Sequence, residues 1–231
     1  MHIMEGFLPL YWCVVWYVIA LPIVAYGAYK MNMVIKENRE LLPLLAVSGA
    51  FIFVLSSLKM PSVTGSCSHP TGTGIGAILF GPAVTSVLSI IVLIFQAIFL
   101  AHGGLTTLGA NTVSMGIVGP TVGYLVYKAC KKQNVNLYLT VFLAALFADW
   151  FTYIVTSIQL ALAFPAASGG VLTSFEAFLS VFAITQVPLA IVEGAVSALM
   201  FKYIVQLRGD VLLKLNVASP ETIKKLQEAS L

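Results

Sequence analysis

The first two residues of the chain carry three nitrogen atoms that suit a metal chelate. Met1 offers the amine of the first residue, and His2 offers its backbone amide nitrogen and the Nδ1 atom of its imidazole. On one ion these atoms would close two fused rings, and an amine with a pKa near ~8 is partly neutral at cellular pH. Because planar nitrogen sites favour Ni(II) or Cu(II), the pattern predicts a planar site that one further nitrogen completes.

A second histidine, His69, lies in a small, polar run that interrupts the apolar sequence, TGSCSHPTGTG (64–74). A polar, glycine-rich start of a broken membrane helix is a common feature of binding sites in transporters. His69 is therefore predicted to supply the fourth nitrogen. Cys67 could add a soft ligand, but a Cys-X-His pair alone is weak evidence, and Cys67 is interpreted as a packing residue.

Four further residues could support such a site. His102 opens the polar run HGGLTTLGAN and could orient a metal ligand, although capping of the preceding helix is the favoured interpretation. Glu5 could add charge beside the site. Asp149 and Glu193 are acids within apolar stretches, where a cation path or a proton relay is one hypothesis. Hydrogen bonding inside the protein is the favoured one, since no Lys or Arg lies at matching depth.

The sequence also argues against several classes of function. It has no G-x-x-x-x-G-K-[ST] loop for ATP, and it has neither H-E-x-x-H nor G-x-S-x-G, the motifs of zinc peptidases and serine hydrolases. The net charge of +3 is small, so no nucleic-acid partner is expected. The chain is predicted not to be an enzyme.

The elements that must position these residues are membrane helices. Hydrophobic residues make up 59% of the 231 residues, and charged residues make up only 9%. A helix of about 20 apolar residues spans the ~30 Å hydrocarbon core of a bilayer. The sequence predicts one all-α integral membrane domain over residues 1–231, without a cleaved signal peptide. The apolar stretches are 10–29, 41–58, 76–101, 110–127, 137–164 and 175–203.

Basic residues set the expected orientation, since cytoplasmic loops of membrane proteins hold the excess of Lys and Arg. Of the 12 basic residues, all but Lys59 fall in or beside the 30–40 loop, the 128–136 loop or the C-terminal tail (204–231). These segments are predicted to be cytoplasmic. The N-terminus is then outside, and residues 1–9 form an extracytoplasmic metal-binding arm.

This orientation requires an odd number of crossings between the loop at 59–75, expected outside, and the loop at 128–136. Only two apolar stretches lie between these loops. We therefore predict that the third stretch breaks at Gly81-Pro82 into two crossings, about 68–80 and 83–101, because irregular backbone at membrane depth is tolerated where protein surrounds it. The total becomes about seven transmembrane helices.

The first nine residues, MHIMEGFLP, resemble the N-terminus of the CbiM/NikM family. The resemblance covers about residues 1–205 and includes both His2 and His69. Further motifs that resemble those of the family are HPTGTG (69–74), AILFGP (77–82), HGGLTTLGAN (102–111), SMG (114–116) and ADW (148–150).

This resemblance implies a fold, a site and a set of partners. Family members are substrate-binding (S) subunits of energy-coupling factor (ECF) importers for cobalt and nickel, with a six-helix core and one extra N-terminal helix. The resemblance implies that the Met1 amine, the His2 amide and imidazole nitrogens, and His69 hold the metal. It implies a multi-pass protein in the lipid bilayer of the cell (inner or plasma) membrane. The expected partners are a coupling membrane subunit, ATPase subunits and often a small accessory membrane subunit.

These residues are compatible with two kinds of transport function. The leading prediction is a metal-binding transport subunit whose substrate ion is Ni(II) or, alternatively, Co(II), imported for nickel enzymes or cobalamin biosynthesis. Nitrogen ligands in a plane favour Ni(II), because d⁸ Ni(II) gains more from that geometry. The alternative is a proton-coupled secondary cation carrier that uses Asp149 and Glu193. No enzyme cofactor is expected in either case.

Overall fold

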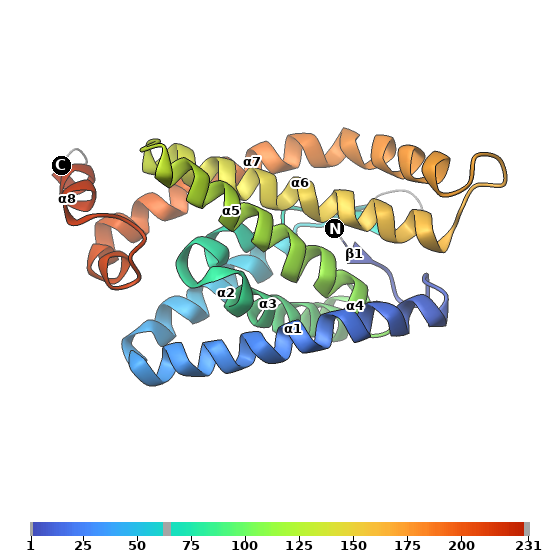
Figure 1. The fold of residues 1–231 in the computed structure, drawn as a ribbon, viewed down its shortest axis with the longest axis horizontal. Helices are drawn as coiled ribbons and strands as arrows, with labels where there is room; N and C mark the ends of the chain where they lie inside the picture. Colours follow the sequence, from blue (N-terminus) through green and yellow to red (C-terminus); the bar gives the residue numbers. More distant parts are fainter. Residues whose placement is uncertain (1, 62–65, 229–231) are drawn as a thin grey trace.

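The apolar stretches fold into a bundle of long helices, described for residues 2–61 and 66–228 of a computed structural model (Figure 1). A 3-10 turn, η1, precedes α2, and a π-helix, η2, joins α4 to α5 without a break. Three short strands accompany the helices. The helical elements are α1 (Leu10–Glu37), η1 (Arg39–Leu41), α2 (Leu42–Ser57), α3 (Thr73–Leu100), α4 (Leu108–Asn111), η2 (Thr112–Val118), α5 (Gly119–Lys132), α6 (Leu137–Ala163), α7 (Gly170–Lys214) and α8 (Pro220–Glu228). The strands are β1 (His2–Ile3), β2 (Met60–Pro61) and β3 (Ser66–Ser68).

Five helices in the described part of the chain are long and apolar enough to cross a membrane: 10–37, 39–57, 73–100, 137–163 and 170–214. The predicted stretch at 110–127 corresponds to the continuous run of α4, η2 and α5. With α3 divided into two halves, the bundle has the seven helical segments predicted for it. The all-α membrane fold is therefore confirmed, and its orientation across the bilayer stays a prediction.

Helix α3 is broken where Gly81 meets Pro82, as predicted. Gly81 has φ 81° and ψ 164°, a conformation that glycine adopts readily, and Pro82 has no N–H to donate. The half before the break packs closely on α6, since a Cβ on Gly74 would lie 2.7 Å from the Cα atom of Ala145. This contact fixes the start of α3, and with it the segment that carries His69.

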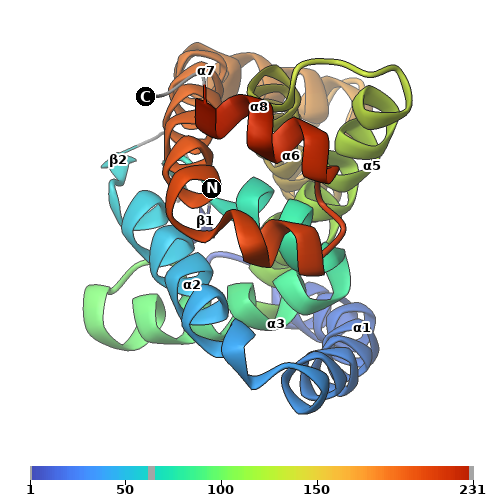
Figure 2. The ribbon, with the colours of Figure 1, turned by 90° about the vertical axis from the view of Figure 1, so that its left-hand side faces the viewer.

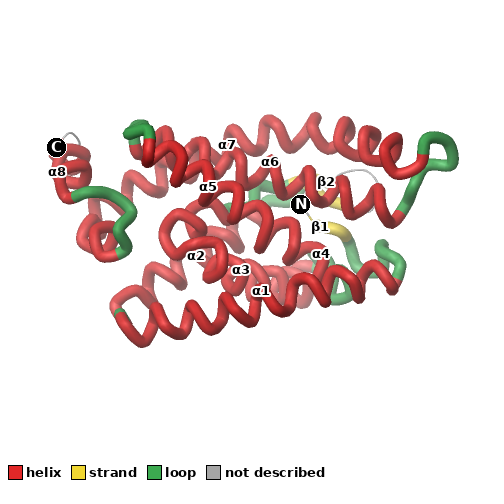
Figure 3. Tube along the Cα trace, viewed as in Figure 1, coloured by secondary structure: helices red, strands yellow, loops and turns green. Residues whose placement is uncertain are grey.

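The three strands form a small antiparallel sheet in the order β1-β3-β2, a feature that the sequence did not predict. His2 pairs with Cys67, and Met60 pairs with Ser68. Figures 1 and 3 show the strands between the α6–α7 pair and α1, and His2 and Ile3 are fully buried. Strands this short have no measurable alternation of polar and apolar residues, so periodicity could not reveal them.

The C-terminal part of the chain covers one end of the bundle, as Figure 2 shows with α8 lying across it. Helix α7 bends at Arg208 (φ −139°, ψ 41°), so the tail expected from residue 204 begins within this helix. The Oγ atom of Ser219 accepts a hydrogen bond from the Thr222 N–H at 3.2 Å. Ser219 therefore caps the start of α8, and Pro220 is the first residue of the helix, a position that proline favours.

Candidate metal centre

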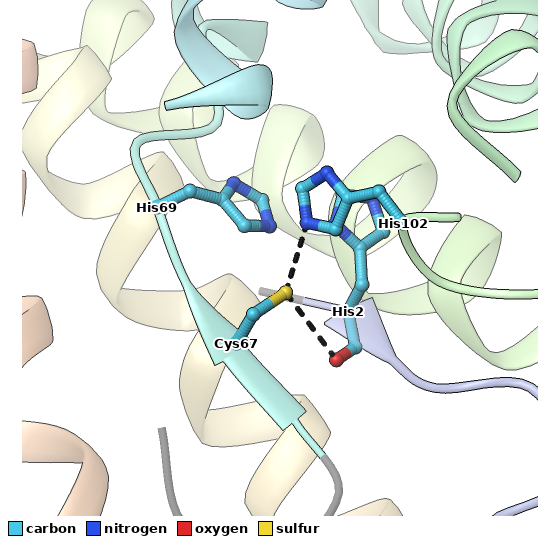
Figure 4. Close-up of side chains that lie close together, drawn as sticks. All are labelled: His2, Cys67, His69 and His102. Atoms are coloured by element: carbon cyan, nitrogen blue, oxygen red, sulfur yellow. Dashed lines mark hydrogen bonds between the residues drawn. The ribbon is translucent and has the colours of Figure 1, made fainter. Parts of the chain in front are cut away.

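Four potential metal-ligating side chains converge beside the small sheet: His2, Cys67, His69 and His102 (Figure 4). His2 lies on β1 and Cys67 on β3, whereas His69 precedes α3 and His102 follows it. One ligand atom from each residue lies within 4.8 Å of the other three. All four side chains are buried, so water does not compete for these atoms.

The separations within the cluster suit ligands that share one ion. The His2 Nδ1 and His102 Nε2 atoms are 3.0 Å apart, and the Cys67 Sγ atom is 2.8 Å from His102 Nε2. With metal–nitrogen bonds of about 2.0 Å, two nitrogens lie about 2.8 Å apart at a right angle and about 3.3 Å apart at a tetrahedral angle. The rings of His2 and His69 are stacked, with 4.4 Å between their centroids.

The hydrogen bonding of His69 leaves one of its ring nitrogens free to bind a metal. Its Nδ1 atom lies 2.7 Å from the carbonyl oxygen of Pro70. Because a carbonyl oxygen can only accept, Nδ1 carries the proton and Nε2 carries the lone pair. Nε2 is buried without a hydrogen-bond partner among the described residues, and Figure 4 shows the ring directed toward His102 and Cys67. A bond that fixes the tautomer in this way is typical of metal-ligating histidines.

Burial keeps the three imidazoles neutral. It lowers the pKa of His2 and of His69 well below the usual 6.5, with a further contribution from the neighbouring histidines. Burial also lowers the pKa of His102, to about 3. The pKa of the Cys67 thiol is raised, again mainly by burial. Near neutral pH the cluster therefore offers three nitrogen lone pairs, while the thiol must lose a proton before it binds an ion.

Asn111 holds the N-terminal arm in place, and sequence reasoning missed this role. Its Oδ1 accepts the Ile3 N–H at 2.8 Å, and its Nδ2 donates to the Ile3 carbonyl at 3.0 Å. The hydroxyl of Thr107 donates to the same carbonyl at 2.8 Å. The side chain of Asn111 thus replaces a neighbouring strand for β1. Asparagine is common in turns of many kinds, so its presence in a glycine-rich polar run does not indicate a specific role. Its role is seen only from its contact with Ile3, which is distant in sequence.

Replacing Asn111 by alanine is expected to weaken metal binding by about tenfold, the lower end of the range for residues that orient metal ligands. The reason is that the backbone N–H and carbonyl of Ile3 both lose their hydrogen bonds to the Asn111 side chain. The neighbouring residue His2 is then held less firmly. Calorimetric titration of Co(II) into the purified protein in detergent measures the change.

Asn136→Ala is the matched control. Asn136 accepts hydrogen bonds from Tyr138 N and Leu139 N at the start of α6. Its loss should lower thermal stability without changing the affinity for Co(II). Equal weakening of binding by both substitutions would contradict a specific role for Asn111.

The structure brings two of the predicted ligands together and changes the interpretation of two other residues. His2 and His69 meet in the cluster, whereas Met1 lies outside the described residues. Cys67, interpreted from the sequence as a packing residue, places its Sγ atom among the clustered ligand atoms. His102 does close the end of α3, through its N–H and the carbonyl of Gln96 at 3.1 Å, but its ring also joins the cluster.

The acids take positions outside the four-residue cluster. Glu5 accepts the Thr106 N–H at 3.1 Å and so holds the loop that carries His102. Glu193 accepts hydrogen bonds just before α3, which confirms internal bonding for this one of the two buried acids. Asp149 is buried on α6, and its Oδ2 atom has no partner in the part of the chain that the structure describes.

Comparison with known proteins decides the family. The family model for the "Cobalt uptake substrate-specific transmembrane region", CbiM, matches residues 2–211. The chain belongs to the CbiM family. It is therefore a multi-pass membrane transport protein and not an enzyme, as predicted.

Several relatives carry the name of a CbiM cobalt transport protein. One from Methanosarcina barkeri is 67% identical and covers 98% of both chains. Another from Methanosphaerula palustris is 66% identical and covers 99% of both chains. A crystal structure described as a truncated transition metal transporter superposes with a TM-score of 0.78 at 27% identity, covering 89% of this chain and 98% of that one. The CbiM fold and its general role in transition-metal transport therefore rest on sequence and structure together.

Proposed function

We propose that this CbiM-family chain is the substrate-binding subunit of an ATP-driven ECF-type importer and that it binds Ni(II) or Co(II) in the four-residue cluster. The observation that carries the proposal is the burial of three neutral imidazoles with their ligand atoms converging on one point. Buried polar atoms normally have partners. Here the free Nε2 of His69 faces the other donors, and a divalent ion would satisfy it.

The proposed inner ligands are the Met1 amine, the amide and imidazole nitrogens of His2, and the Nε2 atom of His69. His102 and Cys67 lie close enough to add donors outside that plane. Four nitrogens in a plane favour Ni(II), and the added donors would suit Co(II), which accepts more ligands or a tetrahedral set. Absorption spectra of the loaded protein distinguish the two: planar Ni(II) gives a low-spin band, and its absence would contradict the preference for nickel.

The proposed orientation places residues 1–9 and the cluster outside, and residues 204–231 in the cytoplasm. The basic residues that support it lie at the α1–α2 turn, at the α5–α6 turn and in the C-terminal segment. A tag added after Leu231 should therefore be protected from antibodies in intact cells. A tag that reacts without permeabilisation would contradict this orientation.

Metal uptake should require the partner subunits. Cells without their own importers should accumulate cobalt or nickel when this chain is produced with the coupling subunit and the ATPase subunits. Uptake should be lost when the phosphate-binding lysine of the ATPase is replaced, because hydrolysis then fails.

If cells that produce this chain alone take up as much metal as cells that also produce the partner subunits, the carrier that uses Asp149 and Glu193 would be favoured. The contacts of Glu193 argue against that carrier. Both of its carboxylate oxygens already accept hydrogen bonds from the protein.

A further inference from the structure

Glu193 is a fully buried acid in the middle of α7, and it forms none of the three ion pairs seen among the described residues. Its carboxylate instead accepts hydrogen bonds from the segment before α3. The Thr71 hydroxyl and the Gly72 N–H donate to Oε1, each at 2.8 Å, and the Thr71 N–H donates to Oε2. Three donors from two consecutive residues thus meet one carboxylate on another helix.

The N-cap residue of α3 has no side chain, and the acid at this end of the helix comes from α7. The N-cap residue is Gly72, with φ 71° and no side chain. The first N–H groups of a helix have no partner within the helix, and its positive end attracts an anion. A Cβ on Gly72 would lie 3.0 Å from the Cα atom of Ile52, so a larger residue has no room here. The Thr73 N–H reaches the Thr71 hydroxyl at 3.4 Å, and Glu193 accepts the N–H groups of Thr71 and Gly72 just before the helix, which places its negative charge at this positive end.

Helix α7 holds the same segment at a second point. The hydroxyls of Ser68 on β3 and Thr185 on α7 are 2.7 Å apart. Thr185 and Glu193 are eight residues apart on α7, about 12 Å along the helix and little more than two turns. His69 lies between the two anchored points of the segment, Ser68 and Thr71.

We propose that Glu193 is a positioning residue for the metal ligand His69. Together with Thr185, it fixes residues 68–72 on α7, so that the Nε2 atom of His69 faces the other donors. The inference rests on the proposed metal site, because it assigns Glu193 no contact with the ion. Glu193 therefore affects metal binding only by holding His69 in position.

A double-mutant cycle tests this route. Glu193→Gln keeps the size of the side chain but turns an NH₂ group toward N–H donors. It should weaken Co(II) binding by about tenfold, as loss of groups that orient a ligand typically does. In the His69→Ala background the same substitution should cause no further loss, because the residue that Glu193 positions is gone. The Co(II) absorption spectrum of Glu193→Gln should shift toward that of His69→Ala.

Ser197→Ala is the matched control, because Ser197 is fully buried on α7 one turn after Glu193 and its Oγ atom has no hydrogen-bond partner among the described residues. It should leave the Kd for Co(II) unchanged. The inference is overturned if Glu193→Gln binds as the wild type does, or if it weakens binding equally in both backgrounds. If His69→Ala itself binds as the wild type does, the proposed metal site fails as well, and this outcome separates the two claims.

If Glu193→Gln does not fold, Thr71→Val takes its place in the cycle. This substitution removes one of the three hydrogen bonds to Glu193, together with the contacts between the Thr71 hydroxyl and Thr73, and it keeps the volume of the side chain. It should weaken Co(II) binding by about threefold. The loss should again be absent in the His69→Ala background, and a loss of equal size there would overturn the inference.

Discussion

Acetylating the amine of Met1 is expected to abolish tight binding of Ni(II). The acetylated nitrogen is an amide, so it no longer offers a lone pair to close a ring with the His2 amide nitrogen. Two fused rings then become one, because the new amide releases its proton far less readily than an amine offers its lone pair. The expected loss is more than about 100-fold in Kd, since losing a ligand exceeds the 10–100-fold effect of losing a group that only orients one.

Protein acetylated on lysines alone is the control and should leave Kd unchanged. Mass spectrometry of both proteins must show which amines carry the acetyl group. Should the N-terminally acetylated protein keep its full affinity, the ligands would be side chains alone, and His2, Cys67, His69 and His102 would form the complete site.

His69→Ala is expected to weaken binding of Ni(II) and of Co(II) by more than about 100-fold. His69 Nε2 is fully buried and already oriented by the bond from Nδ1 to Pro70, so its loss removes a ligand that is held in place before the ion binds. Calorimetric titration gives the affinity, and thermal unfolding of the metal-free protein shows whether the fold is retained.

His102→Ala and Cys67→Ala provide the comparison, because both side chains belong to the same cluster. Each should weaken binding less than His69→Ala does, since neither belongs to the proposed planar set. A larger loss from His102→Ala would assign the fourth ligand to His102 and reduce His69 to a neighbour of the site.

The sequence predicted the parts of the molecule that depend on local chemistry. The break of α3 follows from Gly81-Pro82, because one residue allows a positive φ and the next removes a donor. His2 and His69 were found from their residue types and from the polar run in an apolar sequence. The helices were found from the length of the apolar stretches, as the bilayer requires.

The remaining features depend on contacts between residues far apart in sequence. His2 and His102 are separated by 100 positions, and no local pattern indicates that their rings meet. The pairing of β1 with β3 likewise follows from tertiary structure rather than from strand periodicity. Asn111 and Glu193 act on distant backbone groups, so their polar side chains alone could not show which partner each one would find.

The pairing of β1 with β3 would make the proposed metal-binding arm a cover of the site as well as a source of ligands. His2 and Ile3 are fully buried, and the arm is held by Cys67 on one side and Asn111 on the other. We expect opening of the strand to limit the exchange of a bound ion, because these contacts cover the cluster. Affinity and residence time would then depend on the same few hydrogen bonds. Such a site would capture metal slowly and hold it until the arm opens.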